Sequence, residues 1–349
     1  MKIKINNNLY FNSEGPPLLI AEISANHCGS KKKFLQHILE AKKSGADLVK
    51  IQTYEVSDMT INNKFKIESG TWKGLNISSL YKKAQTPFEW HYDAFKLAKK
   101  NKICLFSTPF SLRALSFLKK FNPPIYKVAS FEITDHNLIT EIAKTNKPII
   151  ISTGLANIKE IKEAIKIIKK FHNKIILLHC ISGYPTSEED INLNQIKFLK
   201  KKLKYNFVGL SDHTKDIKAA SLASLFKISA IEKHFIIKKS KKSPDNNFSI
   251  TPKKFKLLKK NIINYYKIMG KDKLIRPKSE KSSHIFRRSI YSTKFIKKGD
   301  LFTKKNIGCY RPNLGISSSY FFKIINKKSP FNIKENTPIK KKIIRLLKI

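Results

Sequence analysis

Eight short apolar segments recur between residues 18 and 235, and a polar cluster and an amphipathic, lysine-rich stretch follow nearly every one. Strands that are apolar throughout and separated by helices are typical of a parallel sheet buried on both faces. Eight such strands close a barrel, so the pattern predicts an α/β fold, a (β/α)8 TIM barrel. The segments are Leu18–Ile23, Leu48–Ile51, Ile103–Phe106, Ile125–Val128, Pro148–Ile151, Ile175–Leu178, Phe207–Leu210 and Ile228–Ile231.

The length of the chain and the spacing of its cysteines limit the class of protein further. The chain has 349 residues, which is enough for one barrel and a small second domain. No run approaches the roughly 18 apolar residues that cross a bilayer, and the first residues lack the pattern of a signal peptide. The four cysteines lie far apart without a C-x-x-C pair. We therefore expect a cytoplasmic protein with reduced thiols.

The charge of the chain has two interpretations. Lysine and arginine number 70 against 25 aspartate and glutamate residues, which gives a formal net charge of +45. Binding to nucleic acid is one interpretation. However, the lysines are spread along nearly the whole chain, and Lys, Ile and Asn are all abundant, as A/T-rich codons would produce. We expect no nucleic-acid or membrane partner, only a positive field that attracts an anionic substrate.

Polar residues follow each apolar segment at the point where the predicted strand ends. The carboxyl ends of barrel strands open on one face, and catalytic groups on this fold lie there. We therefore expect one shared pocket rather than scattered loop polarity. The residues are Glu22 with Asn26 and His27, Lys50 with Gln52, Thr108, Lys127 with Ser130 and Glu132, Ser152, His179 and Cys180 with Ser182 and Tyr184, Ser211 with His213, and Glu232 with Lys233 and His234.

These side chains indicate three kinds of chemistry. Two lysines among hydroxyls suit a phosphate or a carboxylate. Two histidines on adjacent strand ends can share one divalent ion with water and a substrate oxygen. Carboxylates are available as acid, base or orienting groups. In that order the residues are Lys50, Thr108, Lys127, Ser130, Ser152 and Ser211; His213 and His234; and Glu22 and Glu132.

Some of these residue types also serve different roles in proteins. A lysine at a strand end could form a Schiff base, as in aldolases, although two lysines surrounded by hydroxyls favour an anion cradle. Cys180 is interpreted as a small core residue and not as a nucleophile, because His179 beside it faces the opposite side of the strand. The roles of His27 and His179 stay open.

Taken together, the strand-end segments resemble the sialic acid synthase family, whose members condense phosphoenolpyruvate with an amino sugar to give a nonulosonic acid. The resemblance runs in order from about residue 18 to 255 and resumes at 284–316. Its motifs are A-E-I-S-A-N-H (21–27), V-K-I-Q-T-Y (49–54), F-S-T-P-F (106–110), Y-K-V-A-S-F-E-I-T-D (126–135), I-S-T-G (151–154), L-H-C-I-S-G-Y-P-T (178–186), G-L-S-D-H-T (209–214) and I-E-K-H-F (231–235).

The resemblance implies a role for individual residues and a divalent cation, Mn²⁺ or Mg²⁺, as cofactor. The implied roles are catalysis by Glu22, Glu132 and Asp245; phosphoenolpyruvate binding by Lys50, Thr108, Lys127, Ser130, Ser152 and Ser211; sugar binding by Gln52, Tyr184 and Arg311; and metal binding by His213 and His234.

The C-terminal part resembles the antifreeze-like (SAF) module that closes family members. This implies a barrel catalytic domain over residues 1–270, a linker at 271–283 and a small, mostly β SAF domain over 284–349. In the family the module is exchanged across a homodimer. The resemblance therefore implies a domain-swapped homodimer in which Arg311 reaches the partner's pocket and holds the sugar.

Two features resemble the pseudaminic acid synthase branch of the family: Ser24-Ala25 after Glu22, and the segment Gly70-Thr71-Trp72-Lys73-Gly74. Ordinary packing also accounts for the tryptophan. The branch implies condensation of phosphoenolpyruvate with the open-chain aldehyde of a 2,4-diacetamido-trideoxy hexose and water, giving pseudaminic acid and phosphate by C–O cleavage. N-acetylneuraminate or legionaminate synthesis is the alternative, and a non-catalytic polyanion binder is the hypothesis from another class.

The sequence departs from the family pattern at three positions. Ser243 stands where family members usually have the glycine of a Gly-Pro-Asp motif, which removes the most flexible residue from the loop before Asp245. Ser182 stands where N-acetylneuraminate synthases often have asparagine. Cys28 replaces a common asparagine after His27. None of these changes removes a group assigned to the chemistry.

Overall fold

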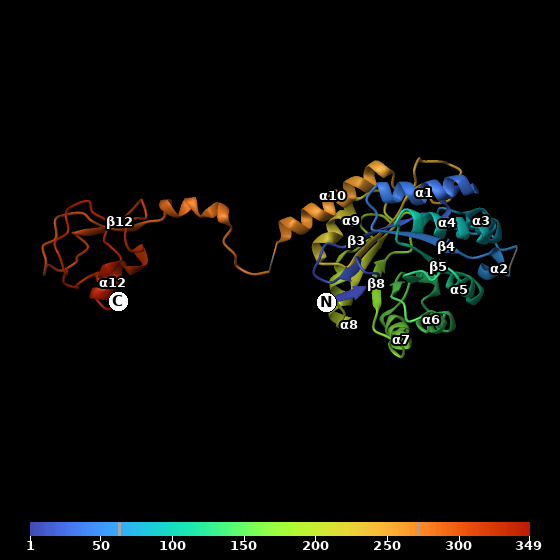
Figure 1. Ribbon diagram of the computed structural model, residues 1–349, viewed down its shortest axis with the longest axis horizontal. Coiled ribbons are helices and arrows are strands. Elements are labelled where there is room, and N and C mark those ends of the chain that lie inside the picture. Colours follow the sequence, from blue (N-terminus) through green and yellow to red (C-terminus); the bar gives the residue numbers. More distant parts are fainter. Residues whose placement is uncertain (62–63, 271) are drawn as a thin grey trace. The chain divides into compact units, whose positions relative to one another are not determined.

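The computed structural model describes residues 1–61, 64–270 and 272–349. The chain divides into two compact units, Met1–Gly270 and Lys271–Ile349 (Figure 1). Each unit has its own hydrophobic core. In the described part of the chain, no helix has the length and apolar character needed to cross a bilayer.

The first unit is a closed barrel of parallel strands, which confirms the predicted TIM barrel. The strands follow one another around the barrel in chain order, and β10 pairs with β3 to close it. They are β3 Leu18–Glu22, β4 Leu48–Thr53, β5 Leu105–Pro109, β6 Tyr126–Val128, β7 Ile149–Ser152, β8 Ile175–Cys180, β9 Val208–Asp212 and β10 Ala230–His234. Most strands extend past the predicted apolar segments to include the polar residues.

Helices surround the barrel, and most of them, though not α2, bury an apolar face against the outer side of the strands. In α7, for example, Ile161, Ala164, Ile165 and Ile168 are buried at helical spacing, and a capping box of Asn157 and Glu160 starts the helix. The helices are α1 Lys31–Lys43, α2 Val56–Met59, α3 Ile77–Ala84, α4 Phe88–Lys100, α5 Leu112–Lys119, α6 His136–Ala143, α7 Ile158–Lys169, α8 Asn194–Leu203, α9 Lys218–Ala223 and α10 Pro252–Met269.

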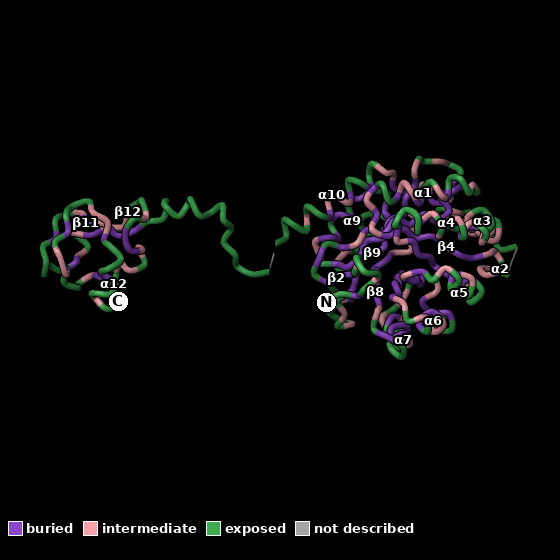
Figure 2. Tube along the Cα trace, viewed as in Figure 1, coloured by how far each residue is buried: buried purple, intermediate pink, exposed green. Residues whose placement is uncertain are grey.

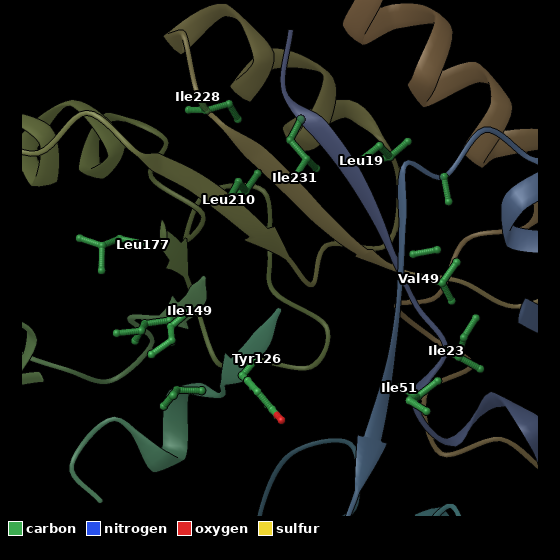
Figure 3. Packing of buried hydrophobic residues seen from close by; sticks show 14 of the residues in the cluster. Leu19, Ile23, Val49, Ile51, Tyr126, Ile149, Leu177, Leu210, Ile228 and Ile231 are labelled. Carbon is green, nitrogen blue, oxygen red and sulfur yellow. The ribbon is translucent and has the colours of Figure 1, made fainter. Parts of the chain in front are cut away.

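Two separate apolar clusters show which side of each strand faces inward. The larger cluster joins strands to helices and includes Leu19, Val49 and Leu210 (Figure 3). The smaller one contains barrel residues such as Ile20 and Leu48 together with residues of an N-terminal hairpin. That hairpin, β1 Lys2–Lys4 and β2 Tyr10–Asn12, adds Ile3 and Phe11 to the barrel interior and has no counterpart in the sequence prediction. Figure 2 shows the barrel strands among the buried parts of this unit.

The second unit is built on a small antiparallel sheet of β11 Ser289–Ser292 and β12 Ile307–Tyr310. Isolated bridges such as Ile296 to Ile333 extend the pairing. Its core consists largely of isoleucines, including Ile290, Ile316 and Ile339. Two short helices, α11 Phe321–Ile324 and α12 Lys342–Leu346, and the 3₁₀ turns η4 Lys278–Glu280, η5 Ser282–Phe286 and η6 Ser318–Tyr320 complete it.

Candidate active site

Strand alternation places the predicted polar residues at one mouth of the barrel. Side chains two residues apart lie on the same face of a strand. In every barrel strand, or directly before it in the case of β6, an interior position filled by an apolar residue or glycine is followed, two residues later, by a polar residue or cysteine. These pairs are Ile20 and Glu22, Leu48 and Lys50, Phe106 and Thr108, Ile125 and Lys127, Ile150 and Ser152, Leu178 and Cys180, Gly209 and Ser211, and Ala230 and Glu232.

Two buried lysines and two buried glutamates meet at the centre of this mouth. The Lys50 ammonium contacts the carboxylate of Glu22, its neighbour in the β3–β4 register. The same ammonium lies 3.5 Å from Oε1 of Glu232, and the Lys127 ammonium lies 3.7 Å from that oxygen. Glu232 therefore stands between the two cations.

Glu232 is a site residue to which the sequence prediction assigns a strand end but no role. Strand alternation alone marks it, because Glu232 lies two residues before His234 and so faces the same interior. Ser211, its cross-strand partner, donates a hydrogen bond to Oε1 at 3.3 Å.

Burial and charge shift the pKa values of these groups in different directions. Burial raises the pKa of Glu22, and the Lys50 charge only partly opposes it. Burial also raises the pKa of Glu232, but the charges of Lys127 and Lys50 outweigh the effect of burial and lower this pKa to about 2. Burial lowers the pKa of Lys127, whereas for Lys50 the charges of Glu22 and Glu232 overcome burial and raise it. Glu22 is thus the carboxylate better able to hold a proton.

Hydroxyl groups surround the two ammonium groups. Lys127 donates to Oγ of Ser152 at 2.7 Å, and Lys50 donates to Oγ1 of Thr108 at 3.4 Å. Beside them, the N–H of Gly154 donates to Oγ of Ser130 at 3.2 Å. A Cβ at Gly154 would lie 2.3 Å from Oγ of Ser182 and 2.8 Å from Oγ of Ser130, so only glycine fits here. We call the space bordered by Gly154, Ser130 and Ser182 the Gly154 cradle.

His213 and His234 form a pair at the end of β9 and β10, with ring centroids 5.4 Å apart. Nδ1 of His213 donates to the carbonyl oxygen of Ile181 at 2.9 Å. Nδ1 of His234 lies 3.6 Å from Oδ2 of Asp245. In both rings one nitrogen faces a fixed oxygen, which leaves Nε2 for another partner.

This geometry fits a divalent ion shared by the two imidazoles. A metal-bound histidine ordinarily directs its other nitrogen at a carbonyl or carboxylate, as both rings do here. Across the described ranges, no three His, Cys, Asp or Glu residues are arranged to hold a metal by themselves. An ion at this place therefore needs further ligands from substrate or water, as an open catalytic site does.

Asp245 is held behind the histidine pair by several contacts. Its Oδ2 accepts a hydrogen bond from the N–H of Ala25 at 3.2 Å. Burial raises the pKa of Asp245, but its interactions with His234, Ser24 and Ala25 together lower it. Ser243, which stands where the family usually has glycine, donates to Oδ1 of Asn26 at 2.6 Å and accepts from the Asp245 N–H at 3.2 Å. The serine thus ties the Asp245 loop to the loop after β3.

The remaining predicted residues are placed as follows. Glu132 is half-buried in η2 Ser130–Glu132, and burial raises its pKa to about 7. Gln52 is a half-buried neighbour of Thr108. Tyr184 packs against His213 with ring centroids 4.2 Å apart. Arg311 is exposed in the second unit.

The structure also places three residues whose segments flank the predicted site, His27, His179 and Cys180. Nε2 of His179 faces the carbonyl oxygen of Ile191 at 2.7 Å, on the helix side of β8. His27 packs edge-on against Phe34 and Trp90. Cys180 faces the mouth, and its thiol lies 3.8 Å from Nδ1 of His213. The expectation that Cys180 and His179 face opposite sides of the strand agrees with these contacts.

Polar atoms without partners are concentrated at this mouth. Ten buried side-chain oxygen or nitrogen atoms in the described part of the chain have no hydrogen-bond partner, and six of them belong to the site. Native proteins rarely leave such atoms unpaired, so their concentration at one place indicates a ligand. The six atoms are both carboxylate oxygens of Glu22, Oε2 of Glu132, Oγ of Ser182, Oε2 of Glu232 and Nδ1 of His234. Two of them have a charged neighbour, because Oε2 of Glu22 is ion-paired with Lys50 and Nδ1 of His234 faces Asp245, so four are left for a ligand.

Comparison with known proteins agrees with this geometry. A family model described as the NeuB family matches residues 37–274. The chain is 41% identical to a pseudaminic acid synthase of Helicobacter pylori, covering 93% of this chain and 96% of that protein. It is 35% identical to an N,N'-diacetyllegionaminic acid synthase of Campylobacter jejuni, covering 93% and 98%. A crystal structure of the N-acetylneuraminic acid synthetase of Leptospira borgpetersenii, in complex with citrate, matches with a TM-score of 0.74 at 32% identity, covering 81% of this chain and 95% of that one.

Proposed function

This chain belongs to the NeuB family, and from that membership we propose that it condenses phosphoenolpyruvate with the open-chain aldehyde of a 2,4-diacetamido-trideoxy hexose and water. The products are pseudaminic acid and inorganic phosphate, released by C–O cleavage. Relatives that are named pseudaminic acid synthases reach 38–41% identity over nearly the whole chain, against 35% for a legionaminic acid synthase.

The observation that carries this proposal is the group of buried, unpartnered polar atoms beside two buried lysines. Four such atoms gather at the barrel mouth, besides one that is ion-paired with Lys50 and one that faces Asp245, and Lys50 and Lys127 lie among them. Leaving a buried polar group without a hydrogen bond costs about 1–3 kcal/mol. A polar, anionic ligand that supplies these bonds on binding accounts for the arrangement.

The lysines and hydroxyls bind the phosphate and carboxylate of phosphoenolpyruvate. Fixed cations and oriented donors in a site closed to water stabilise an anion more strongly than they would in solution. Glu232, between the lysines, keeps both ammonium groups charged and in place. The binding set is Lys50, Thr108, Lys127, Ser130, Ser152 and Ser211, with Ser182 completing the Gly154 cradle.

The remaining residues orient the sugar and move protons. C3 of phosphoenolpyruvate attacks the aldehyde carbon, water adds at C2, and the resulting tetrahedral intermediate loses phosphate. Glu22, buried beside Lys50 with a raised pKa, stabilises the cationic C2 and takes the proton of the water. Gln52, Glu132, Tyr184 and Asp245 hold the sugar.

His213 and His234 would hold a divalent cation, Mn²⁺ or Mg²⁺. When bound, such an ion supplies Lewis-acid polarisation of the aldehyde oxygen. The hydrogen bond from His213 to Ile181 and the carboxylate of Asp245 beside His234 fix the orientation of the two rings.

The second unit is proposed to be the SAF domain, after a linker at 271–283. Its exposed Arg311 would supply a cation for the sugar in the pocket of a partner subunit, in a domain-swapped homodimer. All four cysteines are free thiols, which suits a cytoplasmic enzyme.

Phosphate release with a panel of sugars tests the proposed function. Purified protein is mixed with phosphoenolpyruvate, Mn²⁺ and, one at a time, the 2,4-diacetamido-trideoxy hexoses that lead to pseudaminic and legionaminic acids, and N-acetylmannosamine. We expect the largest kcat/KM with the pseudaminic acid precursor. A larger value with another sugar would reassign the product, and no release with any sugar would reject the synthase.

Replacing a metal-binding histidine should abolish ion binding and activity together. In His213→Ala we expect the affinity for Mn²⁺ to fall more than about 100-fold, because loss of a direct ligand costs more than loss of the groups that orient one. Electron paramagnetic resonance of free Mn²⁺, after treatment with a chelator, measures this without turnover. His179→Ala is the matched control, since His179 is buried on the helix side. Full activity in excess chelator would rule out the metal.

A further inference from the structure

Trp72 lies at the tip of a small hairpin-like loop before α3. The loop is closed by an antiparallel bridge between Lys66 and Asn76 and by the bond from the Gly74 N–H to the Ile67 carbonyl oxygen, 2.7 Å. Gly70 and Gly74 have φ angles of 77° and 81°, which side chains rarely adopt. The two glycines therefore allow the turns on either side of Trp72.

This tip is bound to the two loops that carry the proposed sugar residues. The indole N–H of Trp72 donates to the carbonyl oxygen of Pro244 at 3.2 Å, next to Asp245. The hydroxyl of Thr71 donates to the carbonyl oxygen of Tyr184. Trp72 is thus attached both to the loop after β8 and to the loop after β10.

The ring of Trp72 continues an aromatic surface that ends at the histidine pair. Its centroid lies 5.4 Å from that of Tyr184, whose ring lies 4.2 Å from that of His213. Phe248 backs the surface, 5.1 Å from Tyr184 and 4.8 Å from His234. Phe248 is fully buried, whereas Trp72 is half-buried and retains an exposed part.

We propose that Trp72 is a specificity-determining residue, whose indole contacts the apolar groups of the sugar: its terminal methyl group and an acetamido methyl. This inference rests on the proposed function. A sugar held by its aldehyde beside His213 and His234 extends its far end along the surface formed by Tyr184 and Trp72. A trideoxy sugar gains from burying methyl groups there, whereas a sugar with hydroxyls at those carbons leaves them unpaired against the indole.

Kinetics with two sugars test the proposal. In Trp72→Ala we expect KM for the pseudaminic acid precursor to rise at least about 10-fold, with KM for phosphoenolpyruvate unchanged, because one lost apolar contact is worth about 10–200-fold. The preference for this sugar over N-acetylmannosamine, as a ratio of kcat/KM values, should fall by a similar factor, and Trp72→Phe should restore part of it.

The second tryptophan provides a control and a binding signal. Trp90 packs against His27 and Phe34, so Trp90→Phe should keep both KM values. In that variant Trp72 is the only tryptophan, and its fluorescence should change when the non-reactive alditol of the precursor binds with phosphoenolpyruvate present.

The possible failures are distinguishable. No phosphate release with any sugar would reject the synthase itself. If the unaltered protein turns over, two results would reject the role of Trp72 alone. One is a sugar preference that Trp72→Ala leaves unchanged, and the other is a tryptophan fluorescence that the alditol does not alter. A lower kcat at an unchanged preference would assign Trp72 only to bracing Tyr184 and would also overturn the proposal.

Discussion

Glu22→Gln is expected to bind phosphoenolpyruvate normally and to turn over about 10²–10⁴-fold more slowly, the range that one general acid or base contributes. Glutamine keeps the shape of the side chain but cannot take a proton from water or carry the charge that stabilises a cationic C2. The substitution also removes one negative charge beside Lys50. Binding of the anionic substrate should therefore be as tight as before or tighter.

Single-turnover kinetics and a separate titration with phosphoenolpyruvate in the absence of sugar measure the two quantities. Glu141→Gln is the control, because Glu141 lies on α6 away from the barrel mouth, pairs with Lys144 and should keep full activity. Near-normal turnover in Glu22→Gln would remove Glu22 from the mechanism. Loss of phosphoenolpyruvate binding would instead assign Glu22 to holding Lys50 in position.

Lys233→Met is expected to destabilise the barrel by about 3–5 kcal/mol, the usual cost of leaving one partner of a buried ion pair alone. Lys233 and Asp212 are fully buried and neighbours in the β9–β10 register, with Nζ 2.9 Å from Oδ2. The ammonium also donates to the carbonyl oxygen of Thr214. Methionine fills the space but leaves a buried carboxylate and a carbonyl group without their donor.

Urea unfolding followed by tryptophan fluorescence reports on the barrel, since both tryptophans lie in the first unit. Lys259→Met is the matched control. Its ion pair with Asp47 is about a quarter exposed, so we expect a loss of about 1 kcal/mol or less. Replacing both Asp212 and Lys233 by apolar residues should recover most of the stability. Equal losses in Lys233→Met and Lys259→Met would contradict this account.

Much of the site could be predicted from local sequence, because the period of a strand is set by neighbouring residues alone. An apolar residue followed two positions later by a polar one, as in Ile20 and Glu22 or Ile150 and Ser152, already places the polar group on the inner face near the carboxyl end. The number of segments and the helices between them then suffice for a barrel. Glu232 fits the same pattern, but a carboxylate at a strand end has no distinctive role until its neighbours across the barrel are known.

Contacts between distant segments do not follow from local sequence. The position of Glu232 between Lys50 and Lys127 depends on closure of the barrel, which brings together β4, β6 and β10 from across the ring. The contact between the tilted rings of Trp72 and Tyr184 depends on where two loops meet. The packing of Ile3 and Phe11 against the barrel interior depends on how the N-terminal hairpin folds. The sequence by itself determined which residue types face inward, since alternation is local; the tertiary structure alone decided which of them meet, since charge pairing and burial depend on distances across the closed barrel.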